Sequence, residues 1–590
     1  MPLKFFTILF FYGIMNTVNR NDIGKGNMSC NEREKYERRI AYISMEIGID
    51  PKIPTYAGGL GILAGDTIKS YADLNIPLIA VTLLFKKGYF HQDLDGQGNQ
   101  VEIPSEWNPG DFLSLFHERV SVNIEGKKVL IQVWRYEVIG INGYCIPIYF
   151  LDTDIEENSE YDRSLSYYLY GGDEKYRLSQ EIVLGIGGVR MVHELGYHRI
   201  NRCHMNEGHS SLLTLELLNE RNKDKDAEWN GDDIKRLCVF TTHTPVPAGH
   251  DKFSYDLVGS VLGEFIPFDR LRQLGGPDTL NMTLLALNLS HYINGVAKEH
   301  GMISREMFPG YHIDSITNGV HSQTWVCECF KRLYDKYIPG WSKDPFSLRY
   351  ALSIPGQEIW NVHQEAKKIL IDYINSTKHT GMDYQTLTIG FARRATGYKR
   401  ADLVFFDINR LRNIVKNAGN IQFVFSGKAH PRDWQGKELI KKIFAISQTL
   451  KNQIKIVYLD NYEIELAKML ISGVDLWLNT PQKPQEASGT SGMKAAHNGI
   501  PSFSILDGWW IEGCIEGLTG WSIGSPHDTE GSDQDHAHSL YGKLENVIIP
   551  MFYTKRENWI DIMRHTIAIN ASFFNTHRMV QQYVLNAYLL

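Results

Sequence analysis

The segment from residue 474 to residue 506 constrains the fold more than any other part of the chain. Residues 474–479 (VDLWLN) predict a buried strand, residues 493–498 predict a short helix, and residues 500–506 predict a second strand after the capping glycine Gly499. Strands joined through a helix pair in parallel, so this segment is a unit of a parallel α/β sheet. The loop before the helix then lies at the carboxyl edge of the sheet, where such folds bind ligands.

This loop is rich in small and hydroxylated residues, and a lysine lies just inside the helix that follows it. Backbone N–H groups at a helix start attract anions, and the hydroxyls of Ser488, Thr490 and Ser491 can donate to phosphate oxygens. Lys494 is therefore a candidate for carrying a phosphorylated cofactor. The alternative is an ordinary glycine-serine loop with a solvated lysine, which local composition alone favours.

The size and composition of the chain indicate a multidomain globular protein. A chain of 590 residues with 43% apolar and 22% charged residues can build more than one core. Its net charge of −7 and dispersed basic residues argue against a nucleic-acid partner. The seven cysteines contain no C-x-x-C pair, and we expect no metal site. We interpret His204, Glu207 and His209 as a polar active-site cluster rather than as metal ligands.

The plan of strand, turn, helix and strand occurs twice. It is predicted for residues 40–85, around the glycine turn 58–61, and again for residues 386–426, where a helix is expected over 399–416. Residues 86–160 resemble an insertion, and residues 284–306 predict one long helix. We therefore expect an α/β fold of two Rossmann-like lobes that face a central cleft.

The expected domain boundaries follow from this pattern. They are a disordered leader at 1–35, an N-terminal domain at 36–355 and a C-terminal domain at 356–590, whose last helix could pack back on the first domain. The apolar run 5–15 is too short to span a bilayer and lacks a cleavage pattern, so we expect a leader or a misassigned start. No membrane association is predicted, and a cytoplasmic location is the simpler expectation.

Four basic residues follow the predicted strand 386–392: Arg393, Arg394, Lys399 and Arg400. At the start of a helix, cations oppose the macrodipole unless an anion lies nearby. The pattern therefore favours a phosphate site, although a solvated basic turn fits it equally well.

These features come together in one resemblance. The chain resembles the α-glucan phosphorylases of the short bacterial type, with motifs in family order from about residue 40 onward. The matching motifs are ISME (43–46), GGLGILAGD (58–66), MNEGH (205–209), THTP (242–245), TNGVH (317–321), Arg394 with YKR (398–400), and EASGTSGMK (486–494). The nine-residue lysine motif together with six others is highly specific. The implied fold is the GT-B-type glycosyltransferase architecture.

The resemblance implies a cofactor. Lys494 would form an imine with pyridoxal 5′-phosphate, whose phosphate would be held by the loop around Gly489, Thr490 and Ser491 and by Arg393. In this family the cofactor phosphate, rather than the imine, takes part in proton transfer. A substrate phosphate would lie beside it, held by Arg394, Lys399 and the backbone N–H of Gly59, a glycine that we also assign to the cofactor site.

The resemblance also implies a reaction and two substrates, an α-1,4-glucan and inorganic phosphate. Phosphorolysis with retention would release glucose 1-phosphate, with the His243 carbonyl stabilising the cationic sugar and Glu486, Ser488, Gly489 and His243 holding its hydroxyls. The remaining implied substrate residues are Gly58, Glu46, Asn206, Glu207 and Tyr398. Without the resemblance, structural roles are favoured for Glu46, Asn206, His209 and His243.

Some positions depart from the longer animal enzymes. Thr396 and Gly397 stand where those enzymes have His-Glu, and no phosphorylatable basic tail precedes residue 40, so we expect no animal-type allosteric control. Two alternatives remain: a synthase-like transferase that uses a nucleotide sugar, and a non-catalytic glucan-binding protein. Lys494 within its full motif argues against the first alternative. The presence of Lys494 together with Arg394, Lys399 and Glu486 argues against the second. A homo-oligomer is compatible with the sequence but is not specified by it.

Overall fold

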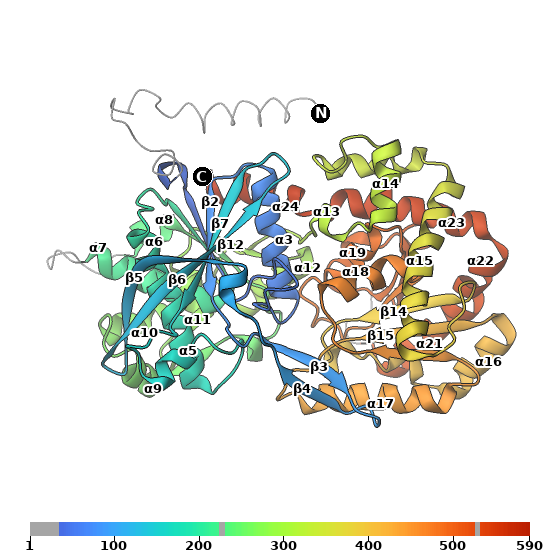
Figure 1. Ribbon diagram of the computed structural model, residues 1–590, viewed down its shortest axis with the longest axis horizontal. Helices are drawn as coiled ribbons and strands as arrows, with labels where there is room; N and C mark the ends of the chain where they lie inside the picture. The colour runs from blue at the N-terminus through green and yellow to red at the C-terminus, as the bar shows by residue number, and fades with distance from the viewer. Residues whose placement is uncertain (1–34, 223–230, 526–530, 590) are drawn as a thin grey trace.

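The computed structural model describes residues 35–222, 231–525 and 531–589 as a mixed α/β protein with two large sheets (Figure 1). Nearly all of the expected leader, residues 1–34, lies outside the described residues. Within the described ranges, no helix is both long enough and apolar enough to cross a membrane. The described cysteines, six of the seven, are free thiols.

The first half of the chain forms a nine-stranded sheet in the order β13-β12-β9-β8-β1-β2-β7-β6-β5. Seven of its strands pair in parallel, and β6 and β5 extend it as antiparallel strands at one edge. The strands are β1 (Ile40–Ile43), β2 (Leu78–Leu83), β5 (Ser114–Ile124), β6 (Lys127–Ile139), β7 (Cys145–Asp152), β8 (Arg202–Asn206), β9 (Cys238–Thr241), β12 (Tyr292–Gly295) and β13 (Asp314–Ser315). From β1 the chain first adds β2 on one side of this strand, and it later returns to add β8 on the other side of β1. The strand order therefore reverses between β1 and β8.

The second half forms a six-stranded, fully parallel sheet in the order β16-β15-β14-β17-β18-β19. This is the order of a doubly wound dinucleotide-binding sheet, with the reversal between β14 and β17. The strands are β14 (Leu387–Ala392), β15 (Ile421–Ser426), β16 (Lys455–Leu459), β17 (Leu476–Asn479), β18 (Ser502–Ile505) and β19 (Gly520–Ile523). The buried strands predicted for the opening segment are thus confirmed.

Helices surround both sheets (Figure 1). Those before residue 340 are α3 (Gly59–Asp73), α4 (Glu160–Ser164), α5 (Glu174–Ile182), α6 (Gly188–Glu194), α7 (Leu213–Arg221), α8 (Asp232–Leu237), α9 (Tyr255–Val261), α10 (Phe268–Gly275), α11 (Met282–Asn288), α12 (Lys298–Met307), α13 (Ser322–Trp325) and α14 (Glu328–Tyr337). Those after it are α15 (Gly356–Lys378), α16 (Ile408–Ala418), α17 (Trp434–Leu450), α18 (Ile464–Gly473), α19 (Ser491–Ala496), α20 (Trp510–Gly513), α21 (Asp533–Lys543), α22 (Ile549–Thr554), α23 (Arg556–His565) and α24 (Thr576–Tyr583).

A hairpin of β3 (Phe90–Leu94) and β4 (Gln100–Pro104) extends from the first half onto the second, beside α17 (Figure 1). Two buried glutamines make the contact. Gln92 Nε2 donates to the carbonyl of Gly427 (3.0 Å) and Gln100 Nε2 to that of Ala429 (2.9 Å). These bonds satisfy backbone groups in the loop after β15, so the hairpin helps to hold the two halves together.

The C-terminal segment returns to the first half and packs on α3. The hydroxyl of Tyr588 lies 2.5 Å from that of Tyr71 and 2.6 Å from Nδ1 of His204. Tyr583 and Ala587 belong to the same core as the strands β1 and β2. Residues at the end of the chain therefore complete a core whose other members come from its first half.

Two expectations about the first half are wrong. Residues 86–160 are not an insertion apart from the sheet, because β7 pairs with β2 and brings β6 and β5 into it. Residues 284–306 are not one helix but α11, β12 and α12. The four residues of β12 are almost wholly buried beside β9, and a short, buried parallel strand has no alternation that distinguishes it from an apolar helix turn.

The helix expected over 399–416 is also wrong in its start. It begins at Ile408, where the carboxylate of Asp407 accepts from the backbone N–H of Arg410 and caps it. Arg400 has a left-handed backbone (φ 46°), which turns the chain before the helix. The four basic residues therefore lie in a loop after β14, so the argument from the helix macrodipole does not apply to them.

Candidate functional site

Glu46 and the glycine turn lie together at the reversal point of the first sheet. Glu46 follows β1 and is buried, and its Oε2 accepts from the backbone N–H groups of Ala57 (2.7 Å) and Gly58 (3.3 Å). Its Oε1 accepts from the hydroxyl of Tyr170 (2.7 Å). The carboxylate thus fixes the turn that starts α3, and Gly59, the first residue of that helix, is exposed.

Asn206, Glu207 and His243 form a second group at the same edge, after β8 and β9. Glu207 Oε2 accepts from the backbone N–H of His243 (2.7 Å), and Asn206 Oδ1 lies 2.6 Å from His243 Nε2. Burial lowers the pKa of His243 to about 3, so its imidazole is neutral at pH 7 and donates through Nε2 to Asn206. Glu207 has a left-handed backbone (φ 80°), a strained conformation of the kind concentrated at functional sites.

The polar cluster expected from His204, Glu207 and His209 does not form. His204 is bound between Tyr588 and Thr241, whereas His209 Nε2 accepts from the backbone N–H of Met45 (2.8 Å). Burial lowers the pKa of both histidines, so both are neutral at pH 7. These two residues have structural roles, and only Glu207 reaches the group around His243.

Arg393, Lys399 and Glu486 meet at the reversal point of the second sheet. Arg393 Nη2 donates to Glu486 Oε2 (2.6 Å), and Lys399 Nζ donates to the same oxygen. Burial alone would raise the pKa of Glu486, but the charges of Arg393 and Lys399 and their hydrogen bonds outweigh it and lower the pKa to about 2. Arg393 Nε and Nη1 are buried and have no hydrogen-bond partner within the part of the chain that the structure describes.

Asp507, after β18, is part of this site although the sequence did not single it out. Its Oδ2 accepts from the backbone N–H of Glu486 (2.9 Å), and its Oδ1 accepts from that of Gly508 (2.9 Å). Burial and the negative charge of Glu486 raise its pKa to about 7. The signal that could have found it was its position, since it follows a predicted strand at the carboxyl edge.

The loop from Ser488 to Ser491 lies beside this carboxylate pair. Gly489 has φ 71°, a left-handed conformation that glycine adopts without strain. Ser488 is buried, and its carbonyl accepts from the backbone N–H of Trp509 (2.9 Å). Ser491 Oγ accepts from Trp477 Nε1 (3.1 Å), and Thr490 precedes α19 without a side-chain cap bond.

Lys494 points its amine at an aromatic ring. Its Nζ lies 3.8 Å from the centroid of the Trp325 indole, and the side chain is buried. Burial is the main cause that lowers the pKa of Lys494 to about 8, with Lys69 acting in the same direction and Asp66 opposing it. A substantial fraction of this amine is therefore neutral near physiological pH, as nucleophilic lysines require.

Arg394 and Tyr398 complete the loop after β14. The Tyr398 ring lies 4.4 Å from Lys399 Nζ, whereas Arg394 has an exposed side chain that interacts electrostatically with Tyr89 and Tyr170 of the first half. Tyr170 is also the residue that donates to Glu46. The loop after β14 therefore lies near these two residues of the first half at Arg394.

One group of residues has the spacing of metal ligands. Asp73, His321 and His577 place one ligand atom each within 4.8 Å of one another. Both histidines already donate through Nε2 to the same oxygen, Asp73 Oδ2, at 2.8 and 3.0 Å. These hydrogen bonds account for the cluster, which ties α24 to α3.

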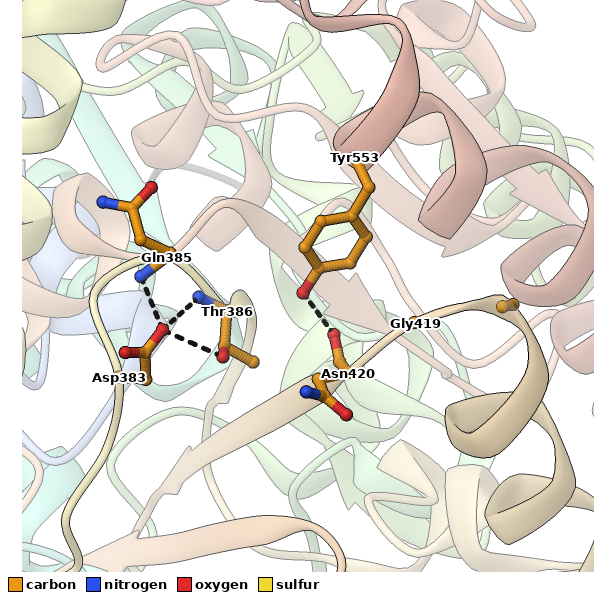
Figure 2. Close-up of a pocket in the computed structure, with 7 residues that line it drawn as sticks. Asp383, Gln385, Thr386, Gly419, Asn420 and Tyr553 are labelled. Atoms are coloured by element: carbon orange, nitrogen blue, oxygen red, sulfur yellow. Dashed lines mark hydrogen bonds between the residues drawn. The ribbon is translucent and has the colours of Figure 1, made fainter.

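One pocket lies away from these residues. Asp383, Thr386, Asn420 and Tyr553 line an open hollow of about 380 Å³ (Figure 2). These residues precede or flank the starts of β14 and β15, so the hollow is at the amino edge of the sheet, and its polar groups are largely bonded among themselves. It contains none of the predicted site residues, and volume alone does not make it the functional site.

Comparison with known proteins gives one consistent result. Residues 269–516 match the carbohydrate phosphorylase family. The chain is 39% identical to the maltodextrin phosphorylase of Thermococcus litoralis, over 93% of this chain and 70% of the relative. It is 34% identical to the glycogen phosphorylase of Aquifex aeolicus (95% and 88%) and to that of Mycobacterium tuberculosis (93% and 70%).

Proposed function

Because this chain belongs to the carbohydrate phosphorylase family, as its motifs predicted, we propose that it cleaves terminal α-1,4-glucosidic bonds of glycogen, starch or maltodextrin with inorganic phosphate. The product is α-D-glucose 1-phosphate, formed with retention. Relatives named maltodextrin and glycogen phosphorylase support this reaction. The observation that carries it is Arg393, whose Nε and Nη1 are buried at the reversal point of the second sheet and have no hydrogen-bond partner among the described residues.

The residues at this point fit pyridoxal 5′-phosphate. Arg393 Nε and Nη1 are two buried donors that no described residue satisfies and that an anion would satisfy. Lys494 supplies an amine whose pKa of about 8 suits imine formation. Lys494 would hold the cofactor covalently, and Gly489, Thr490, Ser491 and Arg393 would hold its phosphate, with Gly59 across the site. When bound, the cofactor supplies a phosphate group that can donate and accept a proton.

The substrate phosphate would be held by Arg394, Lys399 and the backbone N–H of Gly59. A Cβ atom built on Gly58 or on Gly59 meets no atom within 4 Å, so there is open space directly over these backbone groups. The exposed guanidinium of Arg394 approaches from the other half. Phosphate bound there protonates the leaving glycosidic oxygen and then attacks the same face of the sugar.

The glucose unit would be held by the hydroxyl-binding groups beside this anion site. Arg393 and Lys399 both donate to Oε2 of Glu486, which leaves Oε1 available to a sugar hydroxyl. Ser488 and Gly489 follow Glu486 in the same loop. The His243 carbonyl would face the cationic sugar, with the imidazole held neutral by burial. Glu46, Asn206, Glu207 and Tyr398 would line the approach.

This function also sets the expected architecture. We propose a GT-B-type arrangement in which the domains 36–355 and 356–590 face each other across a cleft, with the glucan bound between them. The contacts of the β3–β4 hairpin with the loop after β15 support this division. The chain would act in the cytoplasm, without nucleic acid or membrane, as a monomer or homo-oligomer.

The decisive test is borohydride reduction of the purified protein followed by peptide mapping. We expect a pyridoxyl group on Lys494 and glucose 1-phosphate release from maltodextrin and phosphate. Lys494→Ala should lose both, because no other group can replace the attachment point. Folded wild-type protein with no cofactor absorbance and no label would refute the phosphorylase assignment.

The same assay separates the two alternatives. Glucosyl transfer from a nucleotide sugar, without phosphate dependence, would indicate a synthase-like enzyme. Glucan binding without any turnover, in protein that carries the label, would indicate a binding protein. Lys331→Ala is a matched control, because this partly exposed lysine forms an ion pair with Glu328 on the same helix, outside the site. The variant should leave both readouts unchanged.

A further inference from the structure

Asp66 connects the first half of the chain to the segment that covers Lys494. It lies on α3, two turns after the glycine turn, and is 2% exposed. Its Oδ2 accepts from the indole Nε1 of Trp325 (2.6 Å) and from the backbone N–H of His321 (3.2 Å). A buried carboxylate bonded to an indole N–H is a strong, charge-assisted contact. None of the roles assigned above uses this residue.

Trp325 is held by hydrogen bonds to both its indole and its backbone. Asp66 binds its indole N–H, and its backbone carbonyl accepts from Asn498 Nδ2 (2.9 Å), which also donates to the carbonyl of Lys494 (3.1 Å). The ring is 2% exposed, and Lys494 Nζ lies over its face at 3.8 Å from the centroid. The position of the indole relative to the amine is therefore fixed by a residue of α3 and by a residue just after α19.

We propose that Asp66 is a positioning residue for the cofactor lysine: it holds the Trp325 indole over Lys494 and supplies, through that ring, the negative charge that stabilises the ammonium form. The inference rests on the proposed function, because it concerns the protonation state of the lysine that would bind the cofactor. It makes the reactivity of a lysine in the second half depend on a carboxylate of the first.

The electrostatics of the contact support this role. An anion bonded to the indole N–H increases the negative potential on the ring face, and the ring face in turn attracts a cation. Asp66 raises the pKa of Lys494, whereas burial, the largest cause, and Lys69 on the next turn of α3 lower it. The other titratable groups nearby are His321 and His497, whose pKa values are lowered by burial, so both are neutral at pH 7.

The proposal predicts the pH dependence of cofactor attachment. The amine attacks the aldehyde of pyridoxal phosphate only when neutral, so the attachment rate follows the neutral fraction of Lys494 and has its midpoint near pH 8. In Asp66→Asn the amide oxygen can still accept from the indole but carries no charge. Its midpoint should fall by about one pH unit, which makes attachment at pH 7 about fivefold faster.

The experiment uses full-length protein stripped of cofactor with cysteine, and follows near-ultraviolet absorbance after addition of pyridoxal phosphate between pH 6 and pH 9. Trp325→Phe should lower the midpoint as Asp66→Asn does, and the double variant should add little to either. Lys69→Met is the matched control of opposite sign, since removal of this cation should raise the midpoint.

The outcomes are distinguishable. If wild-type protein attaches no cofactor at Lys494, the proposed function fails. If wild type attaches it and Asp66→Asn keeps the wild-type midpoint, the role of Asp66 is refuted while the function stands. If Asp66→Asn does not fold, as judged by circular dichroism, Trp325→Phe provides the test, and an unchanged midpoint in that variant overturns the relay through the ring.

Discussion

Replacement of Glu486 by Gln should destabilise the protein by an amount that the structure sets. The pKa of Glu486 is about 2 in the folded protein, against an ordinary value of 4.5, and its side chain is 11% exposed. This difference corresponds to roughly 3 kcal/mol of interaction with Arg393 and Lys399 at pH 7. Glutamine keeps the shape but loses the charge, so we expect the free energy of unfolding in phosphate-free buffer to fall by about this amount.

The pH dependence identifies the cause. A carboxylate with a lowered pKa stabilises the fold fully above its unfolded value, and this stabilisation is lost as pH falls through the folded value. The difference between wild type and Glu486→Gln should therefore decrease from roughly 3 kcal/mol at pH 7 to about 1 kcal/mol at pH 3. Urea titrations followed by circular dichroism at both pH values measure it.

Two further results bear on this reasoning. Glu465→Gln, which breaks an exposed pair with Lys468 on α18, should cost less than about 1 kcal/mol and serves as the control. Added phosphate should stabilise Glu486→Gln more than wild type, because the variant leaves Arg393 and Lys399 without their anion. A variant as stable as wild type, or a difference that does not change with pH, would refute the proposed charge interaction.

Two other predictions address the remaining parts of the site. Gly59→Ala should leave the thermal midpoint of unfolding unchanged or slightly raised, because the added Cβ meets no described atom within 4 Å and alanine favours a helix. The same variant should raise the KM for phosphate. An unchanged KM would contradict the placement of phosphate over this glycine. In Asp507→Asn the side chain can no longer accept from the backbone N–H groups of both Glu486 and Gly508, so we expect a lower kcat/KM. Because the pKa of Asp507 is about 7, the ratio of wild-type to variant activity should fall as pH drops below 7. A constant ratio would show that the ionisation of Asp507 does not affect activity.

The parts of the fold that were predictable are those with long periodic signals. The strands around residues 474–506 and 421–426 are continuous buried runs between clear breakers, and the structure places them in one parallel sheet. The lysine loop could be found because residues that directly follow parallel strands meet at one edge, whereas Glu46 was indicated by the resemblance of its motif. That rule requires only strand ends, which the sequence marks well.

The failures have a common physical origin, which is that pairing between distant segments is not encoded locally. Nothing in residues 145–152 indicates that β7 joins β2 rather than a separate insertion. The start of α16 was misplaced because the left-handed turn at Arg400 is stabilised from outside, by bonds to the carbonyls of Thr480 and Pro481 after β17. Asp507 was missed for the same reason, since its role depends on the backbone of Glu486.

The return of the C-terminal segment to the first half has a consequence for how the protein is made. Tyr583, Ala587 and Tyr588 belong to the core that includes β1 and β2. During translation, the nascent first half therefore leaves the ribosome with this core incomplete, and its exposed apolar face must wait for several hundred residues before the missing part is synthesised. The six-stranded sheet ends at Ile523, so all of its strands are synthesised before the C-terminal residues that complete the core of the first half.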